Sequence, residues 1–369
     1  MKVVKITNLH NYVGFKVMRN IYIGDGIAYL SSGSILREEY VRTLQKKKDK
    51  LPFEFVYLDT PDSKEIKCYQ DVLSDELKFK AKKELNEIFN RVSVINSGAL
   101  KNTVEEIIDE LRANKHVNYG IGTLLFAGGQ DQAAHCFNVS VLASIIAIKA
   151  GLPIKNVKEI ALGAALHDIG KAKIKKKLID MRYKYQGKED FIEMQRHPLE
   201  GYNLVRYQNI STLAKRIILM HHIWKNHEKS YNSYFDIYNS YPMKVNGRWI
   251  DPVYKDLSIE IVQVSDVFEA MTNHDRVYKT KKTKSHALEY IRSMEVEQFG
   301  EGARLFLTYI LPFSVGAEVT LNNGERAIVI KQNSIPERPV IKCLSGDREG
   351  RVISLVEREN LTLAIVDEV

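Results

Sequence analysis

The sequence is poor in cysteine, with only Cys68, Cys136 and Cys343 in 369 residues. Because these three are odd in number and far apart, they support neither a disulfide framework nor a zinc site built from cysteine. Disulfides persist mainly in oxidising compartments, so a chain that does not depend on them is typical of the cytoplasm. We therefore expect a cytoplasmic protein with reduced thiols.

A long hydrophobic run is also missing. The longest mainly apolar segment, Val141 to Ile148, is interrupted by Ser144 and followed by Lys149. A helix that spans a membrane needs about 20 apolar residues. The N-terminus begins Met-Lys-Val-Val-Lys and lacks the apolar core of a secretory signal. These two absences predict a chain with no membrane span and no secretion signal.

Proline and glycine, at 9 and 21 residues, are too few for a collagen-like or low-complexity chain. Hydrophobic residues make up 44% and charged residues 27%, as in ordinary globular proteins, and the length predicts two or three domains. The net charge of +8 suits an anionic partner without choosing between a nucleotide, a nucleic acid and a membrane surface. No helix-turn-helix, zinc-finger or aromatic RNA-binding motif is present, so we expect no nucleic acid duplex as a partner.

The hydrophobic pattern predicts a mainly α protein with small β-rich modules at both ends. Its central helix, Asp131–Ala150, is apolar on most sides and is expected to be buried. Asn322-Asn323-Gly324 predicts a hairpin turn in the last module. The predicted parts are an N-terminal β-rich module at 1–73, connector helices at 74–128, a helical domain at 129–311 and a C-terminal β module at 312–369.

Metal chemistry is suggested by the neighbours of five histidines, namely His135, His167, His197, His221 and His222. The strongest element places His167 beside Asp168. Adjacent helix positions are about 100° apart, so the two side chains cannot share a face, but at a helix end they can converge on two metals. The imidazole would ligate one ion and the carboxylate, with two oxygens, would bridge both. The alternative is a polar surface aspartate on a helix that ends at Gly170, and the other four histidines argue against it.

Several motifs then occur in one order along the chain. They are His135-x-x-Asn138-Val139, His167-Asp168-Ile169-Gly170-Lys171, His197-Pro198-x-x-Gly201, His221-His222, Asp266-Val267-Phe268-x-Ala270-Met271 and Asp275-Arg276-x-Tyr278. This series resembles the HD-GYP family, a branch of the HD-domain metal-dependent phosphohydrolases, in detail over residues 129–299. The two β-rich modules resemble, less specifically, the small accessory domains that often flank such catalytic domains.

The resemblance implies an all-helical HD-type catalytic domain that holds two or three divalent metal ions, most often iron or manganese. It implies a hydrolase of bacterial second-messenger signalling. Such a phosphodiesterase opens cyclic di-GMP to the linear dinucleotide or to GMP, and some members act on mixed cyclic GMP-AMP. In such an enzyme the attacking group would be a hydroxide that bridges the metals, which is available at neutral pH because metal ions lower the pKa of bound water. The ligand positions that match are His135, His167, Asp168, His197, His221, His222 and Asp266.

The resemblance also assigns residues to catalysis and to the substrate, cyclic di-GMP or a related cyclic dinucleotide. Asp168 is expected to act in catalysis with Lys171, which matches the family lysine that contacts the scissile phosphate. A solvated surface lysine is the alternative. Arg276 matches an arginine whose planar donors can fork onto phosphate oxygens. Tyr241, in the signature loop, is the third expected substrate contact.

Asp131 is a candidate ligand for a third metal. Trinuclear members of the family carry a glutamate one turn before the first histidine, where this chain has Asp131, four residues before His135. Residues four apart lie on the same helix face, so Asp131 could ligate. The alternative is a helix N-cap before Ala133 and Ala134.

The signature loop departs from the family pattern. The family has His-His-Glu and, shortly after, Gly-Tyr-Pro, whereas this chain has Ile223 after the histidines and then Ser240-Tyr241-Pro242. From His221 to Pro242 the chain runs 22 residues, where the family motif takes about 11. This loop lies where the family reads its substrate, so the departure affects the predicted substrate and leaves the predicted metal ligands unchanged.

Two other functions stay open. An HD-type phosphohydrolase that acts on another nucleotide, mixed cyclic GMP-AMP included, is compatible with the altered loop. A non-catalytic effector that binds a cyclic dinucleotide and signals through the β modules is the second, although a full set of metal ligands argues against it. A homodimer formed through the charged helix Asp75–Phe89 is a further hypothesis.

Overall fold

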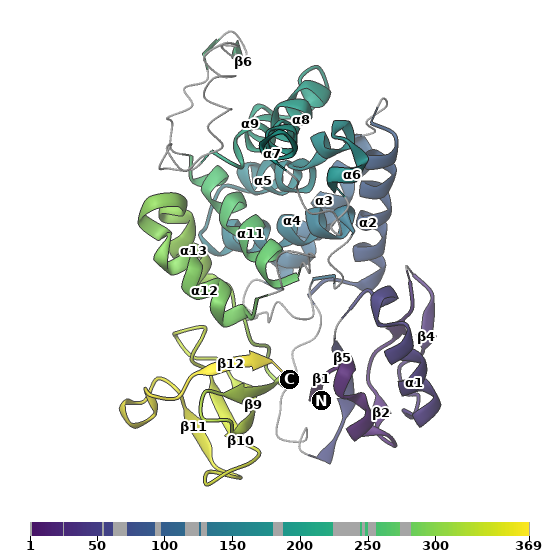
Figure 1. Ribbon diagram of the computed structural model, residues 1–369, viewed down its shortest axis with the longest axis vertical. Helices are drawn as coiled ribbons and strands as arrows, with labels where there is room; N and C mark the ends of the chain where they lie inside the picture. Colours follow the sequence, from purple (N-terminus) through teal and green to yellow (C-terminus); the bar gives the residue numbers. More distant parts are fainter. Residues whose placement is uncertain are drawn as a thin grey trace.

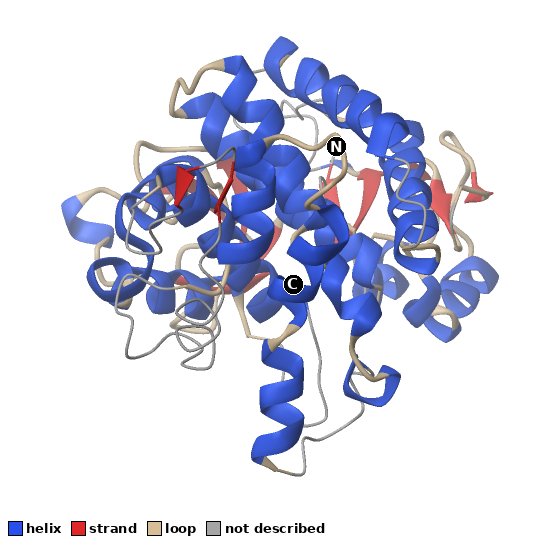
Figure 2. Ribbon diagram, turned by 90° about the horizontal axis from the view of Figure 1, so that it is seen from above, coloured by secondary structure: helices blue, strands red, loops and turns tan. Residues whose placement is uncertain are grey.

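The computed structural model of the chain describes residues 2–24, 26–53, 55–61, 72–92, 97–114, 125–126, 131–179, 187–223, 244–245, 248–249, 256–273 and 282–368. The prediction of a mainly α protein with small β-rich modules at both ends is confirmed, and the sheets of these modules are antiparallel. Figure 1 shows a helical body at one end of the molecule and the N- and C-terminal modules together at the other. Viewed from above, the helices lie in front of most of the strands (Figure 2).

The helical body is a bundle of helices of unequal length. Its described elements are α2 (Asp75–Asn90), α3 (Ser97–Ala113), α4 (Gln132–Lys149), α5 (Ile154–Leu166), a 3-10 turn (Ile169–Lys173), α6 (Lys176–Ile179), α7 (Lys188–Gln195), α8 (His197–Val205), α9 (Thr212–Met220), α11 (Leu257–Asn273), α12 (Lys284–Ser293), a π turn (Glu295–Phe299) and α13 (Gly300–Tyr309). A two-stranded ribbon, β6 (Lys244–Val245) with β7 (Arg248–Trp249), lies between α9 and α11 in the sequence.

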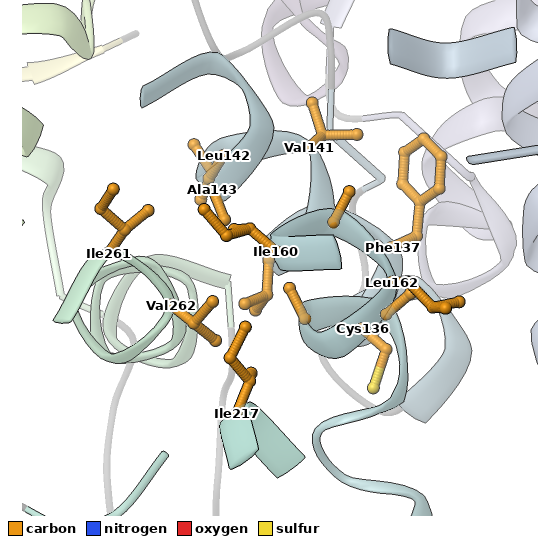
Figure 3. Packing of buried hydrophobic residues seen from close by; sticks show 14 of the residues in the cluster. Cys136, Phe137, Val141, Leu142, Ala143, Ile160, Leu162, Ile217, Ile261 and Val262 are labelled. Atoms are coloured by element: carbon orange, nitrogen blue, oxygen red, sulfur yellow. The ribbon is translucent and has the colours of Figure 1, made fainter. Parts of the chain in front are cut away.

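The centre of this body is α4, as its apolar pattern predicts. Every residue from Ala133 to Ala147 is buried, and the helix packs against α2, α5 and α11. Figure 3 shows side chains of α4, α5, α9 and α11 meeting in one cluster. Among the described residues, α4 has the length and hydropathy of a membrane-spanning helix, but 83% of that window is buried inside the protein. The apolar surface of α4 is therefore used in the core.

The N-terminal module has a small hydrophobic cluster of its own. Its central strand, β5, pairs antiparallel with β1 on one side and with β2 on the other, and β3 pairs with β4 in a short ribbon. The elements are β1 (Lys2–Lys5), a 3-10 helix (Ile6–Tyr12), β2 (Lys16–Val17), β3 (Ile21–Tyr22), β4 (Ala28–Leu30), α1 (Glu38–Lys46), a 3-10 turn (Lys48–Lys50) and β5 (Phe55–Asp59).

The C-terminal module is a five-stranded antiparallel sheet in the order β11-β10-β9-β8-β12, with a separate hydrophobic cluster. Its predicted hairpin turn joins the first two strands, where Gly324 has a φ of +84°, a conformation that glycine adopts without strain. The elements are β8 (Glu318–Leu321), β9 (Arg326–Lys331), β10 (Val340–Cys343), β11 (Val352–Ser354), a 3-10 turn (Arg358–Asn360) and β12 (Ile365–Glu368).

The two terminal modules touch each other. The Val3 amide donates a hydrogen bond to the Gly316 carbonyl at 2.9 Å. Lys2 Nζ lies 3.0 Å from Glu318 Oε2, and the Tyr12 hydroxyl donates to the same oxygen at 2.8 Å. Lys2 and Glu318 are both buried, so their charges compensate each other away from water. The first strand of the chain is thereby fixed to the last module.

The charged helix that suggested a dimer contact is α2. Its buried side chains, among them Leu77, Ala81 and Leu85, belong to the core of the helical body, and α2 packs on α3 and α4 of its own chain. Its apolar face is therefore used within the chain. Dimerisation through this helix stays a prediction.

Candidate metal centre

The structure brings the seven predicted ligands together from five places in the helical body. Six of them are at most 7% exposed, and His222 is partly buried. His135 lies on α4, His167 and Asp168 follow the last residue of α5, His197 begins α8, His221 and His222 follow α9, and Asp266 lies on α11. Residues that are up to 131 positions apart in the sequence thus share one buried cluster.

Two glycines bring His197 close to Asp168. A Cβ atom on Gly170 would lie 1.8 Å from the His197 carbonyl oxygen and 2.4 Å from the Gly201 amide nitrogen. Only a residue without a side chain permits this approach of the 3-10 turn to α8. The glycines of the His-Asp-Ile-Gly and His-Pro-x-x-Gly motifs therefore serve to pack one backbone against another.

Asp168 lies between two groups of imidazoles. Its Oδ1 atom is 3.1 Å from His197 Nε2 and 3.8 Å from His221 Nε2. Its Oδ2 atom is 3.4 Å from His135 Nε2 and 3.3 Å from His167 Nε2. Each carboxylate oxygen therefore faces a different set of rings, which is the arrangement expected of a bridging ligand.

The side chains around Asp168 form two pockets. In each pocket, one ligand atom from every member lies within 4.8 Å of the others, and Cys136 with His167 and Asp168 meets the same distance. We call His135, His167 and Asp266 the α4 pocket, and His197, His221 and His222 the α9 pocket. The Asp168 carboxylate is available to both.

The hydrogen bonds of three rings fix their tautomers. His167 Nδ1 lies 2.7 Å from the Ala164 carbonyl, His197 Nδ1 lies 2.7 Å from the Met194 carbonyl, and His221 Nδ1 lies 2.8 Å from the Ile218 carbonyl. A carbonyl only accepts, so each Nδ1 carries a proton and donates it. In the neutral ring, Nε2 then presents a bare lone pair to the cluster.

The Nε2 atoms of neighbouring rings face one another. His197 Nε2 is 3.1 Å from His221 Nε2, and His135 Nε2 is 3.2 Å from His167 Nε2. Two neutral rings would repel each other there through their lone pairs, whereas a cation between them, a proton or a metal ion, is attracted by both. Metal-ligating histidines typically donate the other ring nitrogen to a carbonyl or a carboxylate, as these do. The donor set and its protonation therefore fit metal ions.

Burial keeps the rings of the α9 pocket neutral. It lowers the pKa of His197, and it lowers that of His221 well below the usual value with help from the neighbouring His222. Burial, followed by the charge of His197, lowers the pKa of His222 to about 3. All three are ready to coordinate at neutral pH without first losing a proton.

The α4 pocket has the opposite electrostatics because it contains carboxylates. Burial lowers the pKa of His135, but Glu269, Asp168 and Asp266 together raise it well above its usual value. In the same way Asp168 outweighs burial and raises the pKa of His167 to about 10. The acidic groups that favour a proton on these rings favour a metal cation in its place.

The carboxylates themselves stay ionised. Burial raises the pKa of Asp168, but Lys171 and the neighbouring histidines outweigh it and hold that pKa well below its usual value. The pKa of Asp266 is likewise lowered, because the hydrogen bond from His135 and the charges of nearby histidines outweigh burial. Both can therefore act as anionic ligands at neutral pH.

Glu269 is a site residue that the sequence analysis missed. It is fully buried on α11, and its Oε2 atom lies 2.5 Å from His135 Nδ1. It also accepts hydrogen bonds from Asn138 and Asn273, each at 2.8 Å. Its position three residues after Asp266 on one helix face could have signalled this role.

Gln132 is a second residue that was missed. Its side-chain amide donates to Asp168 Oδ2 at 2.7 Å. It lies at the start of α4, one turn before His135, so the same helix supplies a ligand and a group that orients the bridging carboxylate.

Asp131 caps a helix, which is one of the two roles that the sequence left open. It is the N-cap of α4, and its Oδ1 atom accepts hydrogen bonds from the Ala133 and Ala134 amides. Its Oδ2 atom pairs with Lys82 Nζ at 2.8 Å. The carboxylate is thus occupied by the helix end and a lysine, and its role as a ligand of a third metal stays a prediction.

Lys171 reaches the cluster directly. Its ammonium donates to Asp168 Oδ2 at 2.5 Å, and its side chain is 17% exposed, more than the carboxylate that it contacts. It therefore lies at the rim of the cluster. Arg276 and Tyr241, the other two predicted substrate contacts, lie outside the described residues, as does the Ser240-Tyr241-Pro242 motif.

Ile223, where the family pattern has a glutamate, is described. Its side chain is buried in the hydrophobic core of the helical body. Its backbone carbonyl accepts a hydrogen bond from Gln263 of α11 at 2.6 Å. The residue that replaces the family glutamate thus packs in the core.

The part of the chain that contains this cluster matches a known protein family. Residues 133–271 match the family model of the HD domain, and all seven ligands of the cluster lie within that segment. The chain therefore contains an HD domain at these residues. The HD domain is the helical body from α4 to α11, and its ordered His and Asp motifs are those that indicated the HD-GYP branch.

Known proteins that resemble the chain include curated and solved examples. A cyclic di-GMP phosphodiesterase of Pseudomonas aeruginosa, PA4108, is 26% identical over 233 residues, which are 62% of this chain and 52% of that protein. The match therefore spans about half the length of the curated relative.

Two solved structures resemble the chain at low identity. Bd1817, an HDG"Y"P protein from Bdellovibrio bacteriovorus, is 17% identical with a TM-score of 0.47, covering 82% of this chain and 97% of that one. The HD domain of the phosphodiesterase PgpH from L. monocytogenes, in complex with cyclic-di-AMP, is 18% identical with a TM-score of 0.34, covering 47% and 85%.

Proposed function

We propose that the protein is a metal-dependent phosphodiesterase that hydrolyses cyclic di-GMP to the linear dinucleotide, to GMP, or to both, in the cytoplasm. The observation that carries the proposal is Asp168, which turns one oxygen toward each of two buried sets of imidazoles. Imidazole and carboxylate donors suit iron and manganese. We expect two ions, or three if Asp131 contributes. The likeness to the Pseudomonas phosphodiesterase supports the choice of substrate.

The side chains have two roles, which are to bind the metal ions and to contact the phosphate. Divalent ions in such a site supply an activated water at neutral pH and neutralise charge on the phosphodiester. Asp168 and the six other ligands hold the site, and buried hydrogen bonds keep their rings in place. Lys171, at the rim, is positioned to pair with a phosphate oxygen. The net charge of +8 favours the approach of an anionic dinucleotide.

A second candidate substrate is another nucleotide, with mixed cyclic GMP-AMP as the nearest in chemistry. The observation in its favour is Ile223, whose buried apolar side chain stands where the family pattern has a glutamate. A site without that carboxylate differs from the family type beside His222. This difference is the observation that favours another substrate.

Metal content and turnover measured on one sample test the proposal. Protein purified without oxygen is analysed for iron and manganese and then assayed with cyclic di-GMP, mixed cyclic GMP-AMP and mononucleotide phosphoesters. We expect about two or three equivalents of metal and a linear dinucleotide or GMP as the product. Turnover of another compound alone would favour the second candidate. Metal-loaded protein that binds cyclic di-GMP without hydrolysis would instead be an effector, and protein without metal would contradict both enzymatic functions.

A further inference from the structure

An aromatic contact joins the N-terminal module to the helical body. Phe53, which precedes β5, stacks on Phe126 with ring centroids 5.5 Å apart and planes inclined by 11°. Phe79 of α2 lies 5.9 Å from Phe53 and 5.7 Å from Phe126, and Tyr22 of β3 lies 5.0 Å from Phe79. Phe126 is buried, whereas Phe53 is partly exposed. The N-terminal module therefore covers the ring of Phe126.

The peptide groups of Phe126 are held by two asparagines of the helical body. Asn138 accepts from the Phe126 amide at 2.8 Å and donates to the Phe126 carbonyl at 3.0 Å. Asn273 donates to the same carbonyl at 3.0 Å. Asn138 is fully buried, so these hydrogen bonds are made away from water, where losing a partner is costly.

The same two asparagines hold Glu269. Asn138 and Asn273 each donate to Glu269 Oε1 at 2.8 Å, and Glu269 Oε2 faces His135 Nδ1 at 2.5 Å. The orientation of His135 is thus set by Glu269, that of Glu269 by the two amides, and that of the amides by the backbone at Phe126. Each step is a direct contact.

From these contacts we propose that the N-terminal module positions a metal ligand. Phe53, by fixing Phe126, keeps Glu269 directed at His135 and so sets the metal affinity of the α4 pocket. Phe53 and Phe126 are positioning residues, and Glu269 is the group through which they act. The inference rests on the metal centre of the proposed function and does not depend on which substrate is cleaved.

The α9 pocket supplies an internal reference. His197 and His221 donate to carbonyls three residues earlier in their own segments. Within the part of the chain that the structure describes, neither ring hydrogen-bonds to Phe126 or to the two asparagines that hold it. A disturbance at Phe53 is therefore expected to reach one pocket and spare the other.

Metal titration of variants tests the proposal. Metal-stripped wild type and Phe53→Ala are titrated with Mn²⁺ by calorimetry and with Co²⁺ by visible absorption. We expect Phe53→Ala to weaken binding in the α4 pocket by about 2- to 30-fold, as usual for residues that couple to a site from a distance. The other pocket should bind as in the wild type, and Phe53→Leu should recover part of the loss.

A matched control distinguishes loss of the contact between Phe53 and Phe126 from general destabilisation of the N-terminal module. Tyr29→Ala removes an aromatic ring of the same module that packs on Tyr40, at a centroid distance of 6.0 Å, and not on α2. It should leave both affinities unchanged. An equal loss in Tyr29→Ala, or wild-type affinities in Phe53→Ala, would overturn the inference while leaving the metal centre in place.

Glu269→Gln tests the last step of the chain of contacts. An amide in place of the carboxylate should lower the affinity of the α4 pocket by about 10- to 100-fold, the usual effect of removing a group that orients a metal ligand. Ser144→Ala is the control, a buried change on α4 where the hydroxyl donates to the Ser140 carbonyl of the same helix. Adding Phe53→Ala to Glu269→Gln should cause little further loss. Fully additive losses would overturn the inference, and wild-type protein that binds no divalent ion would overturn it together with the proposed function.

Discussion

In the α9 pocket, His197 and His221 are each oriented by a carbonyl three residues earlier. In the α4 pocket, His135 is oriented by Glu269, which lies 134 residues further along the chain. His167 of that pocket is held locally, by Ala164, so the difference is concentrated in His135. The α9 pocket is thus formed largely by its own short segments, whereas the α4 pocket depends on how α4, α11 and the N-terminal module pack.

The two pockets also differ in charge. Burial keeps the α9 rings neutral, while nearby carboxylates raise the pKa values of His135 and His167. The comparison indicates that one pocket can take up a cation by lone pairs alone, and that the other exchanges protons for it. Asp168, which faces both, is the group that makes them a single centre.

Removing the shared carboxylate should have the largest effect. Asp168→Ala is expected to lower the metal content of both pockets and to reduce turnover by about 1,000-fold, since metal ions contribute several kcal/mol to such reactions. Elemental analysis and a hydrolysis assay measure the two effects, with Ser144→Ala as the control. Metal lost from one pocket alone would show that Asp168 does not join the two.

Replacing Lys171 should lower the rate of turnover without loss of metal from either pocket. Its ammonium contacts Asp168 Oδ2, but an ammonium does not ligate metal, so Lys171→Ala should keep the metals. Loss of a donor to developing phosphate charge is expected to reduce turnover by about 100-fold. Lys173→Ala, an exposed lysine two residues further on, should behave as the wild type. Metal loss in Lys171→Ala would instead assign this lysine a structural role.

A methyl group at Gly170 should weaken metal binding in the α9 pocket and leave the α4 pocket unchanged. Its Cβ would lie 1.8 Å from the His197 carbonyl, so Gly170→Ala must move the start of α8 away from Asp168. We expect weaker metal binding in the α9 pocket and a loss of about 1–3 kcal/mol in unfolding free energy, as for other overpacked sites. Gly187→Ala, where no atom of the described residues lies within 4 Å, is the control in a denaturant titration. Equal losses in both pockets would contradict the separation.

The smallest expected effect is the pH dependence of metal-free protein. His222 has a pKa lowered to about 3, so its contribution to stability is present above the unfolded value of 6.5 and is lost as the pH falls toward 3. His167 has a pKa raised to about 10, so its contribution is present below 6.5 and is lost as the pH rises to 10. Denaturant titrations in chelator across this range should show a maximum near neutral pH.

Substitutions assign the two limbs of that curve. His222→Gln should reduce the loss on the acid side, and His167→Gln should reduce the loss on the alkaline side. If both variants kept the wild-type profile, the opposite electrostatics of the two pockets would not affect stability.

Much of the site could be predicted from the sequence because its motifs are local. His167-Asp168 at a helix end, the two glycines and the His221-His222 pair combine a donor type with a short spacing, and the structure places all of these in the cluster. The buried central helix was predicted for the same reason, since its apolar pattern covers most of its sides. The HD-domain match covers these motifs.

Other residues could not be predicted because their roles arise from contacts between distant elements. Glu269 looks like any polar residue on a helix until α11 packs beside α4 and brings it to His135. Gln132 gains its role only where the end of α5 approaches the start of α4. For Asp131, spacing alone allowed both a ligand and a cap, and the structure shows the cap.

The sequence by itself determined which donors are present, which helices carry them and, through hydrogen bonds within single turns, which nitrogen of His167, His197 and His221 faces the cluster. Only the tertiary structure decided how the donors divide into two pockets, that Asp168 serves both, and that the N-terminal module reaches His135 through Phe126. The reason is physical. A helix fixes the direction of side chains a few residues apart, whereas distances between helices depend on the packing of the whole core.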